Sequence, residues 1–123
     1  MIVNIFAHSQ IPSVQFPPNQ NFNLKLTRIL GTSTFLIEPG IYVITSDLIQ
    51  RSEGNPHRIL DCILVRERTK CLEFTPTHSH EYKLNRYEIN SPDIKIRSKR
   101  TDEELFFDEL FISFEVRETY GRF

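Results

Sequence analysis

Alternation of apolar and polar residues is clearest near the C-terminus of the chain, at 110–116. The apolar residues there recur at every second position: Leu110, Ile112, Phe114 and Val116. Side chains at this spacing lie on one face of a β-strand. Phe111 is the exception, because it falls among the polar residues of the other face. The pattern predicts a strand with one buried face, which closes the core of a β protein.

Shorter segments of the same kind precede this strand. The predicted strands are 1–7, 22–28, 41–49, 58–65, 69–74 and 93–97. Turn signals separate several of them, notably at 30–33 and at the Glu-Pro-Gly of 38–40, and a loop rich in Pro, Asn and Gln occupies 11–21. We therefore expect about eight short strands and no helix longer than ten residues.

The segment 101–104 has the spacing of a helix capping box, because Thr101 stands three residues before Glu104. One helical turn is therefore an option at this point. A charged hairpin loop is the alternative, and the sequence favours neither.

Regularly spaced strands of this kind are typical of a β-sandwich or a small barrel. With 123 residues, the chain is long enough for one domain, 1–123, with its own core. Eight strands favour a jelly roll over the seven-stranded immunoglobulin type, whose buried Trp is also missing here. We predict an all-β protein: a single antiparallel β-sandwich, jelly-roll-like.

Charge and hydropathy narrow the range of partners. Fifteen Lys and Arg against sixteen Asp and Glu give a net charge of −1, so no global field attracts nucleic acid or anionic membranes. Low net charge also makes self-association easier. No apolar run approaches the roughly 20 residues that span a bilayer, and the start lacks the basic leader of a signal peptide. We expect an intracellular protein without a membrane span.

The two cysteines lie in adjacent apolar runs joined by 66–68. If the loop of a hairpin is 66–67, Cys62 and Cys71 stand opposite each other, with Cα atoms about 4.5–5.5 Å apart and within disulfide range. A slip of one residue removes that pairing. Because no secretion signal is present, we favour buried free thiols over the disulfide.

Catalytic and metal-binding signals are weak. His78 and His80 form an H-x-H pair that could supply two zinc ligands, but no further ligand follows at a diagnostic spacing. An exposed polar loop is therefore the favoured reading of this segment. The chain has no G-x-S-x-G motif and no phosphate-binding glycine loop. We expect no enzymatic activity and no cofactor.

One basic cluster follows the predicted strand 93–97. It comprises Lys95, Arg97, Lys99 and Arg100. These side chains could contact phosphates or an acidic partner. The acidic residues at 102–104 cancel most of their field, so we favour a solvated hairpin tip.

A surplus of apolar residues suggests a protein–protein interface. The side chains of the run 105–107 (Leu-Phe-Phe) cannot all point inward from one strand. The candidate interface residues are Phe16, Phe22, Phe106, Phe107, Phe111, Tyr120 and Phe123. A thick core with a bulge is the alternative.

Two segments resemble the structural, minor capsid-like proteins of Polinton/Maverick transposons and adintoviruses. The segment 16–26 (FPPNQNFNLKL) resembles the F-P-x-N opening of those proteins. Residues 41–43, 46–49 and Gly54 resemble their "LYVYxDI…VGD" segment, and 82–84, 93–96 and 111–114 follow in the same order. This chain is shorter between the first two segments and lacks the Trp that is common there.

The resemblance implies a virion component with a jelly-roll core, which works by assembly and not by chemistry. Its expected partners are other copies of the same chain, as a homo-oligomer, or other capsid proteins, in the virion or the host-cell interior. Two other functions stay open. The first is a β-sandwich module that binds a glycan or a protein partner. The second is a cupin-like metal enzyme, which would need ligands beyond His78 and His80.

Overall fold

The computed structural model describes residues 2–6, 14–17, 20–78, 80–85, 88–89 and 94–119, and their regular structure is entirely β. The strands are β1 (Ile2–Phe6), β2 (Val14–Gln15), β3 (Asn21–Ile37), β4 (Gly40–Ser46), β5 (Ile59–Val65), β6 (Thr69–Phe74), β7 (Glu81–Lys83), β8 (Glu88–Ile89), β9 (Ile94–Ser98) and β10 (Glu109–Thr119). Tyr120 and Phe123 lie outside the described residues.

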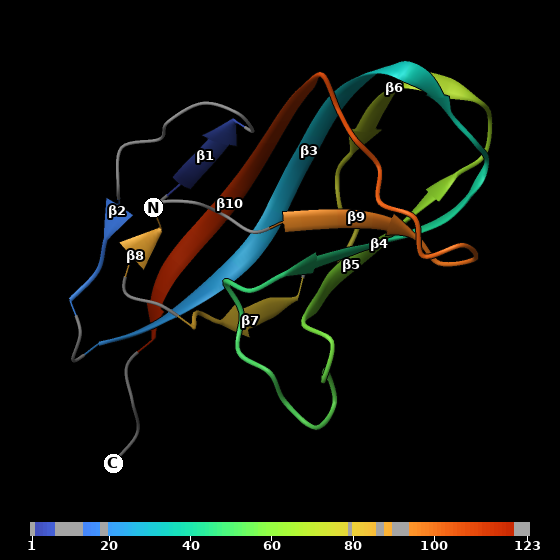
Figure 1. Cartoon of the computed structure of the whole chain (residues 1–123). Helices are drawn as coiled ribbons and strands as arrows, with labels where there is room; N and C mark the ends of the chain where they lie inside the picture. The colour runs from blue at the N-terminus through green and yellow to red at the C-terminus, as the bar shows by residue number, and fades with distance from the viewer. Residues whose placement is uncertain are drawn as a thin grey trace.

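The strand pairs are nested, so that the second half of the chain runs back along the first (Figure 1). Strand β1 pairs with β10, β2 with β8, β3 with β6 and β7, and β4 with β5, all antiparallel. Two further pairs, β10–β3 and β4–β9, join the folded ribbon into sheets of order β1-β10-β3-β6 and β5-β4-β9. A ribbon folded in this way is the jelly-roll arrangement.

Among the described residues, ten strand segments fill the eight strand positions of a jelly roll. Both β6 and β7 pair with β3, at its end and near its start, and together they act as the sixth strand. Strand β8 pairs with β2, and β9, the next strand along the chain, pairs with β4. These are the two partners of the seventh strand in a jelly roll, so β8 and β9 together take its position. The predicted antiparallel sandwich of about eight strands is confirmed.

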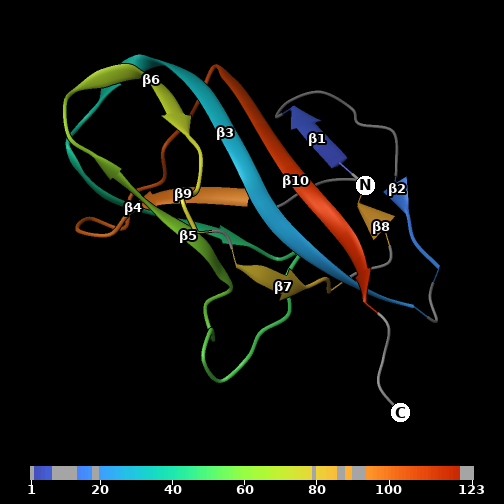
Figure 2. The ribbon, with the colours of Figure 1, turned by 180° about the vertical axis from the view of Figure 1, so that it is seen from behind.

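The core lies between the large sheet (β1-β10-β3-β6, with β7) and the small sheet (β5-β4-β9). Leu24, Ile29 and Phe114 from the large sheet and Ile44 and Ile96 from the small sheet belong to one buried cluster. Strand β10 lies between β1 and β3, and the view from behind shows it beside β3 over the length of the large sheet (Figure 2). The prediction that the last strand closes the core is confirmed.

The turn predicted at 30–33 is wrong, because β3 continues through it. Gly31 pairs with Leu110 on one side and Leu72 on the other. A Cβ atom on Gly31 would lie 2.6 Å from Cδ1 of Phe107. This glycine therefore makes room for an aromatic ring in the middle of a strand, where sequence alone indicates a turn.

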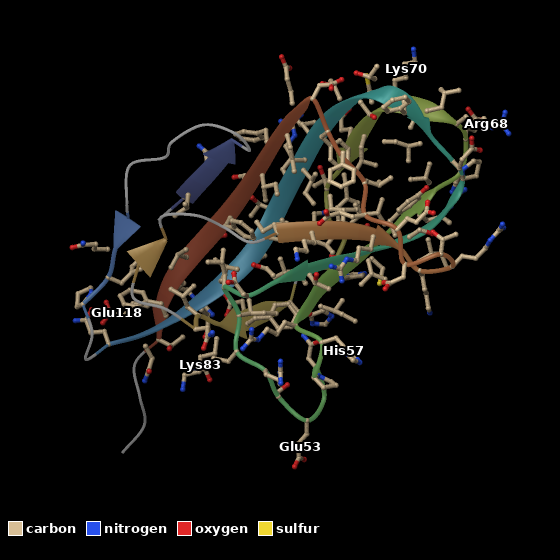
Figure 3. All side chains as sticks on the ribbon, in the orientation of Figure 1. Glu53, His57, Arg68, Lys70, Lys83 and Glu118 are labelled. Atoms are coloured by element: carbon tan, nitrogen blue, oxygen red, sulfur yellow. The ribbon has the colours of Figure 1, made fainter. Side chains whose placement is uncertain are left out.

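The hairpin predicted between 58–65 and 69–74 is also wrong. Strand β5 belongs to the small sheet and β6 to the large one, so the connection 66–68 crosses the edge of the sandwich. Arg68 and Lys70 point away from the sandwich at this crossing (Figure 3). Cys62 pairs with Val43 and Cys71 with Thr32.

Both cysteines are free and exposed. The expectation of buried thiols is therefore wrong, and the alternative disulfide is absent. Each thiol lies on the side of its strand that faces away from the core, because the neighbours Ile63 and Leu72 occupy the buried face.

The segment 98–105 is a charged loop and not a helical turn. Its ends are held together by backbone hydrogen bonds from Ser98 N–H to Glu103 O (2.9 Å) and from Leu105 N–H to Ile96 O (2.8 Å). Asp102 has a φ of 61°, in the left-handed region, which a right-handed helical turn excludes. Of the two alternatives for this segment, the hairpin loop is correct.

Candidate functional site

At one end of the sandwich, β3 leads into β4 and the 99–108 connection enters β10 (Figure 1). Large apolar side chains of these segments and of β5 are exposed. This apolar end comprises Phe35, Leu36, Ile41, Leu64 and Phe106. Phe35 and Phe106 are 79% and 77% exposed, which is unusual for aromatic residues. Among the described residues, Ile2 is the other large exposed apolar side chain, and it lies on β1.

Hydrogen bonds connect the segments that carry these side chains. The Ser33 hydroxyl accepts a bond from the Phe35 N–H (3.2 Å) and lies 3.4 Å from the Phe106 carbonyl oxygen, to which it donates. Thr34 donates to the carboxylate of Asp108. The exposed aromatic residues are thus displayed from an ordered backbone.

Ile41 and Leu64 extend the apolar end along the small sheet. They are direct partners in the β4–β5 pair. Both alternate with core residues, since their neighbours Tyr42 and Ile63 are buried. Their side chains therefore lie together on the outer face of the sheet.

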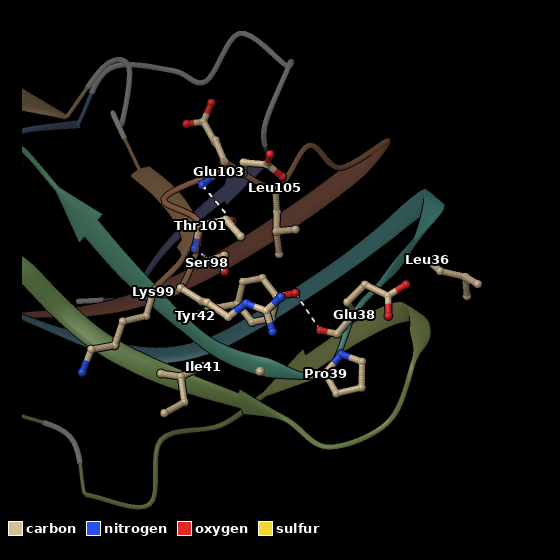
Figure 4. Close-up of a pocket in the computed structure, with 13 residues that line it drawn as sticks. Leu36, Glu38, Pro39, Ile41, Tyr42, Ser98, Lys99, Thr101, Glu103 and Leu105 are labelled. Atoms are coloured by element: carbon tan, nitrogen blue, oxygen red, sulfur yellow. Dashed lines mark hydrogen bonds between the residues drawn. The ribbon is translucent and has the colours of Figure 1, made fainter.

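A cleft of about 710 Å³ opens beside the apolar end, between the β3–β4 turn and the 98–105 loop (Figure 4). Apolar and charged residues of both signs line it. Leu36, Pro39, Ile41 and Leu105 supply the apolar part, and Glu38, Glu103, Glu104, Lys99 and Arg100 the charged part.

Tyr42 anchors the turn that forms one wall of the cleft. Its hydroxyl donates to the carbonyl oxygen of Glu38 at 2.6 Å (Figure 4). Burial, and secondly the Glu38 carboxylate, raise the pKa of Tyr42 above 10.0. The carboxylate of Glu38 also accepts a bond from Arg68 Nε at 2.8 Å. Tyr42 therefore stays protonated near neutral pH and fixes the turn.

The candidate interface residues are divided between the core and the surface. Phe106 is exposed at the apolar end, as predicted. Phe16 and Phe107 are core residues, 5% and 8% exposed, and Phe22 packs 4.8 Å from the Phe16 ring. Phe111 is half-buried in β10. Phe16 and Phe107 therefore leave the candidate interface, because a partner cannot reach side chains enclosed by their own domain.

Sequence reasoning missed Phe35 and Leu36. They are consecutive residues at the end of β3, followed by the buried Ile37. Alternation from Ile37 would place Phe35 inward, yet it is exposed. The pairing of β3 with β6 also shifts register between Thr32 and Ile37. Such an irregularity ends the alternation on which the prediction depends.

The predicted His pair does not assemble a metal site from described residues. His78 and His80 are both exposed. The ring of His80 stands edge-on to Tyr82, with centroids 6.4 Å apart. Within the described part of the chain, no three His, Cys, Asp or Glu residues are grouped so as to hold a metal ion.

Comparison of the chain with protein-family models, with curated proteins and with solved structures gave no match. The described residues contain no helix long and apolar enough to cross a membrane.

Proposed function

We propose that this protein is a non-enzymatic structural subunit, viral or transposon-derived, that assembles into a capsid or virion through its apolar end. The observation that carries the proposal is the display of Phe35 and Phe106, nearly fully exposed, from a hydrogen-bonded framework. Exposed apolar groups that gather in one place are characteristic of protein–protein contacts.

Burial of the apolar end supplies the driving force for assembly. Full burial of an exposed Phe side chain contributes about 1.5–3 kcal/mol. Two Phe residues on each of two copies therefore contribute roughly 6–12 kcal/mol before the costs of association. The net charge of −1 opposes this little.

The fold supports the proposal only in general terms. Jelly rolls form viral capsid proteins, lectin domains and cupins, so the arrangement of strands does not select one function. The viral part of the proposal is supported by the resemblance of segments such as 16–26 to structural proteins of Polinton/Maverick elements and adintoviruses. The proposed partners are accordingly copies of this chain or other capsid proteins.

Molar mass by light scattering after size exclusion, over a range of concentrations, tests the proposal. We expect a discrete oligomer that dissociates when Phe35 and Phe106 are both changed to Ser. The matched control is Ile2→Ser, because Ile2 is 70% exposed but lies away from the apolar end. A monomer at every concentration, or equal dissociation in the Ile2 variant, would refute assembly through the apolar end.

The cleft favours a second candidate, a module that binds a peptide or glycan. Its volume of about 710 Å³ is within the range of small-ligand sites, and charges of both signs line it. This function would be supported if the protein is a monomer and binds a peptide or glycan from a library saturably, and if the Leu105→Asp variant no longer binds that ligand. An oligomer without ligand binding at the cleft would exclude it.

A further inference from the structure

A second cavity, of about 400 Å³, carries a concentration of positive charge. Its basic residues are Arg51, Arg58, Lys95 and Arg97, joined by the imidazole of His57. Among the described residues, Asp47 is the one carboxylate that lines it. We call this cavity the basic pocket. Its charge contrasts with that of the chain as a whole, which is −1.

The outer face of the small sheet forms one wall of the basic pocket. Ile44 and Ile96 are paired core residues on β4 and β9. The next residues along these strands, Thr45, Lys95 and Arg97, therefore face away from the core, and all three line the pocket. Lys95 is the direct pairing partner of Thr45.

The loop between β4 and β5 forms the other wall, and hydrogen bonds order it. The Asn55 side chain accepts from Ile59 N–H and donates to Ile59 O, both at 2.8 Å. Arg58 has a φ of 55° and accepts a bond from Ser46 N–H at 3.1 Å. His57 projects from the same loop (Figure 3). Arg58 is thus held over the end of β4.

Arg58 contributes a buried side-chain donor. Its Nε is buried, and no hydrogen-bond partner is found for it among the described residues. Buried donors are nearly always bonded. The ion pairs formed between described residues are Arg28–Glu73, Arg68–Glu38 and Arg117–Glu81. Within the described part of the chain, the cations of the basic pocket therefore form no ion pair.

We propose that the basic pocket binds a phosphate group. The planar guanidinium groups of Arg58 and Arg97 can each give two parallel hydrogen bonds to phosphate oxygens, and Lys95 adds a point charge. The Thr45 hydroxyl is a neutral donor on the same wall. Residues far apart in sequence converge here, which distinguishes the site from a row of solvated side chains. This site does not depend on assembly through the apolar end.

The phosphate can belong to a free ion or small molecule, or to a nucleic-acid backbone. Two probes separate these sources: inorganic phosphate, and a short single-stranded oligothymidine. Binding of each is followed through the amide signals of Ser46 and Arg58 in ¹H–¹⁵N NMR spectra. We expect saturable shifts with phosphate that weaken as salt is raised.

A pair of variants with the same charge change gives the decisive comparison. Lys95→Gln with Arg97→Gln removes two cations from the basic pocket and should weaken phosphate binding roughly tenfold or more. Lys99→Gln with Arg100→Gln removes two cations from the neighbouring loop, which lines the other cleft, and should leave binding within about twofold. Thermal unfolding of both variants verifies that the fold is retained.

Each outcome decides the proposal. If phosphate binds and the oligonucleotide competes with it, the site takes backbone phosphates. If only phosphate binds, the site takes a free or terminal phosphate group. If both double variants weaken binding equally, or if neither probe shifts the Ser46 and Arg58 signals, the positive charge acts diffusely and the proposed site is refuted.

Discussion

Two consecutive phenylalanines have opposite fates in this protein. Phe107 is 8% exposed and belongs to the core, whereas Phe106 is 77% exposed at the apolar end. Their chemistry is identical, so the difference lies in what the rest of the fold offers each of them. Phe107 fits against the bare backbone of Gly31. Burial in this molecule therefore depends on a space of matching shape, and apolar residues without one form a surface that a partner can cover.

The largest expected effect compares the two environments directly. Phe114→Ala deletes a fully buried ring in β10 and should lower the free energy of unfolding by about 3–5 kcal/mol, through lost burial and the cavity left behind. Phe106→Ala, the same deletion at the apolar end, should change it by less than about 0.5 kcal/mol. Urea denaturation of dilute protein measures both. Similar losses would show that Phe106 also packs in the core.

Gly31→Ala should have a smaller effect. The added Cβ would lie 2.6 and 2.7 Å from two atoms of the Phe107 ring, and the forced displacement should cost about 1–3 kcal/mol. Combining it with Phe107→Leu should cost less than the sum of the two single changes, because the smaller side chain leaves room. Additive costs would show that the two positions do not share this contact.

The smallest expected effect concerns Tyr42, a core residue that also lines the cleft. Burial, and then the Glu38 carboxylate, raise its pKa in the folded state above 10.0. Its contribution to stability is therefore fully present below the pKa of the unfolded chain and is lost as pH rises through the folded pKa. Urea denaturation at several pH values between about 9 and 11 should show that the free energy of unfolding falls less steeply with pH in Tyr42→Phe than in the unchanged protein.

Tyr82→Phe serves as the comparison for this measurement. Burial, followed by Asp61 and Cys62, also raises the pKa of Tyr82, so its removal should flatten the same decline independently. The two effects should add, because the residues lie in different elements of the sandwich. A decline unchanged in both variants would mean that other groups control alkaline unfolding.

Much of the fold could be predicted from the sequence, but less of the site. Alternation at 110–116 identified β10 and its buried face, and the Glu-Pro-Gly segment identified the β3–β4 turn. The candidate interface was harder, because a surplus of aromatic residues does not say which of them are left outside. Of the candidates, Phe106 is exposed and Phe16 and Phe107 are core residues, whereas the exposed Phe35 and Leu36 were not among the candidates.

The order of apolar and polar residues is enough to identify this chain as a β protein with particular buried faces, because side-chain alternation is a local property of an extended backbone. Tertiary structure decided the partner of each strand, as in the crossing at 66–68, where a hairpin was expected. It also brought Arg58 to the strand that carries Lys95 and Arg97. Such pairings depend on contacts between distant segments, and no local pattern encodes them.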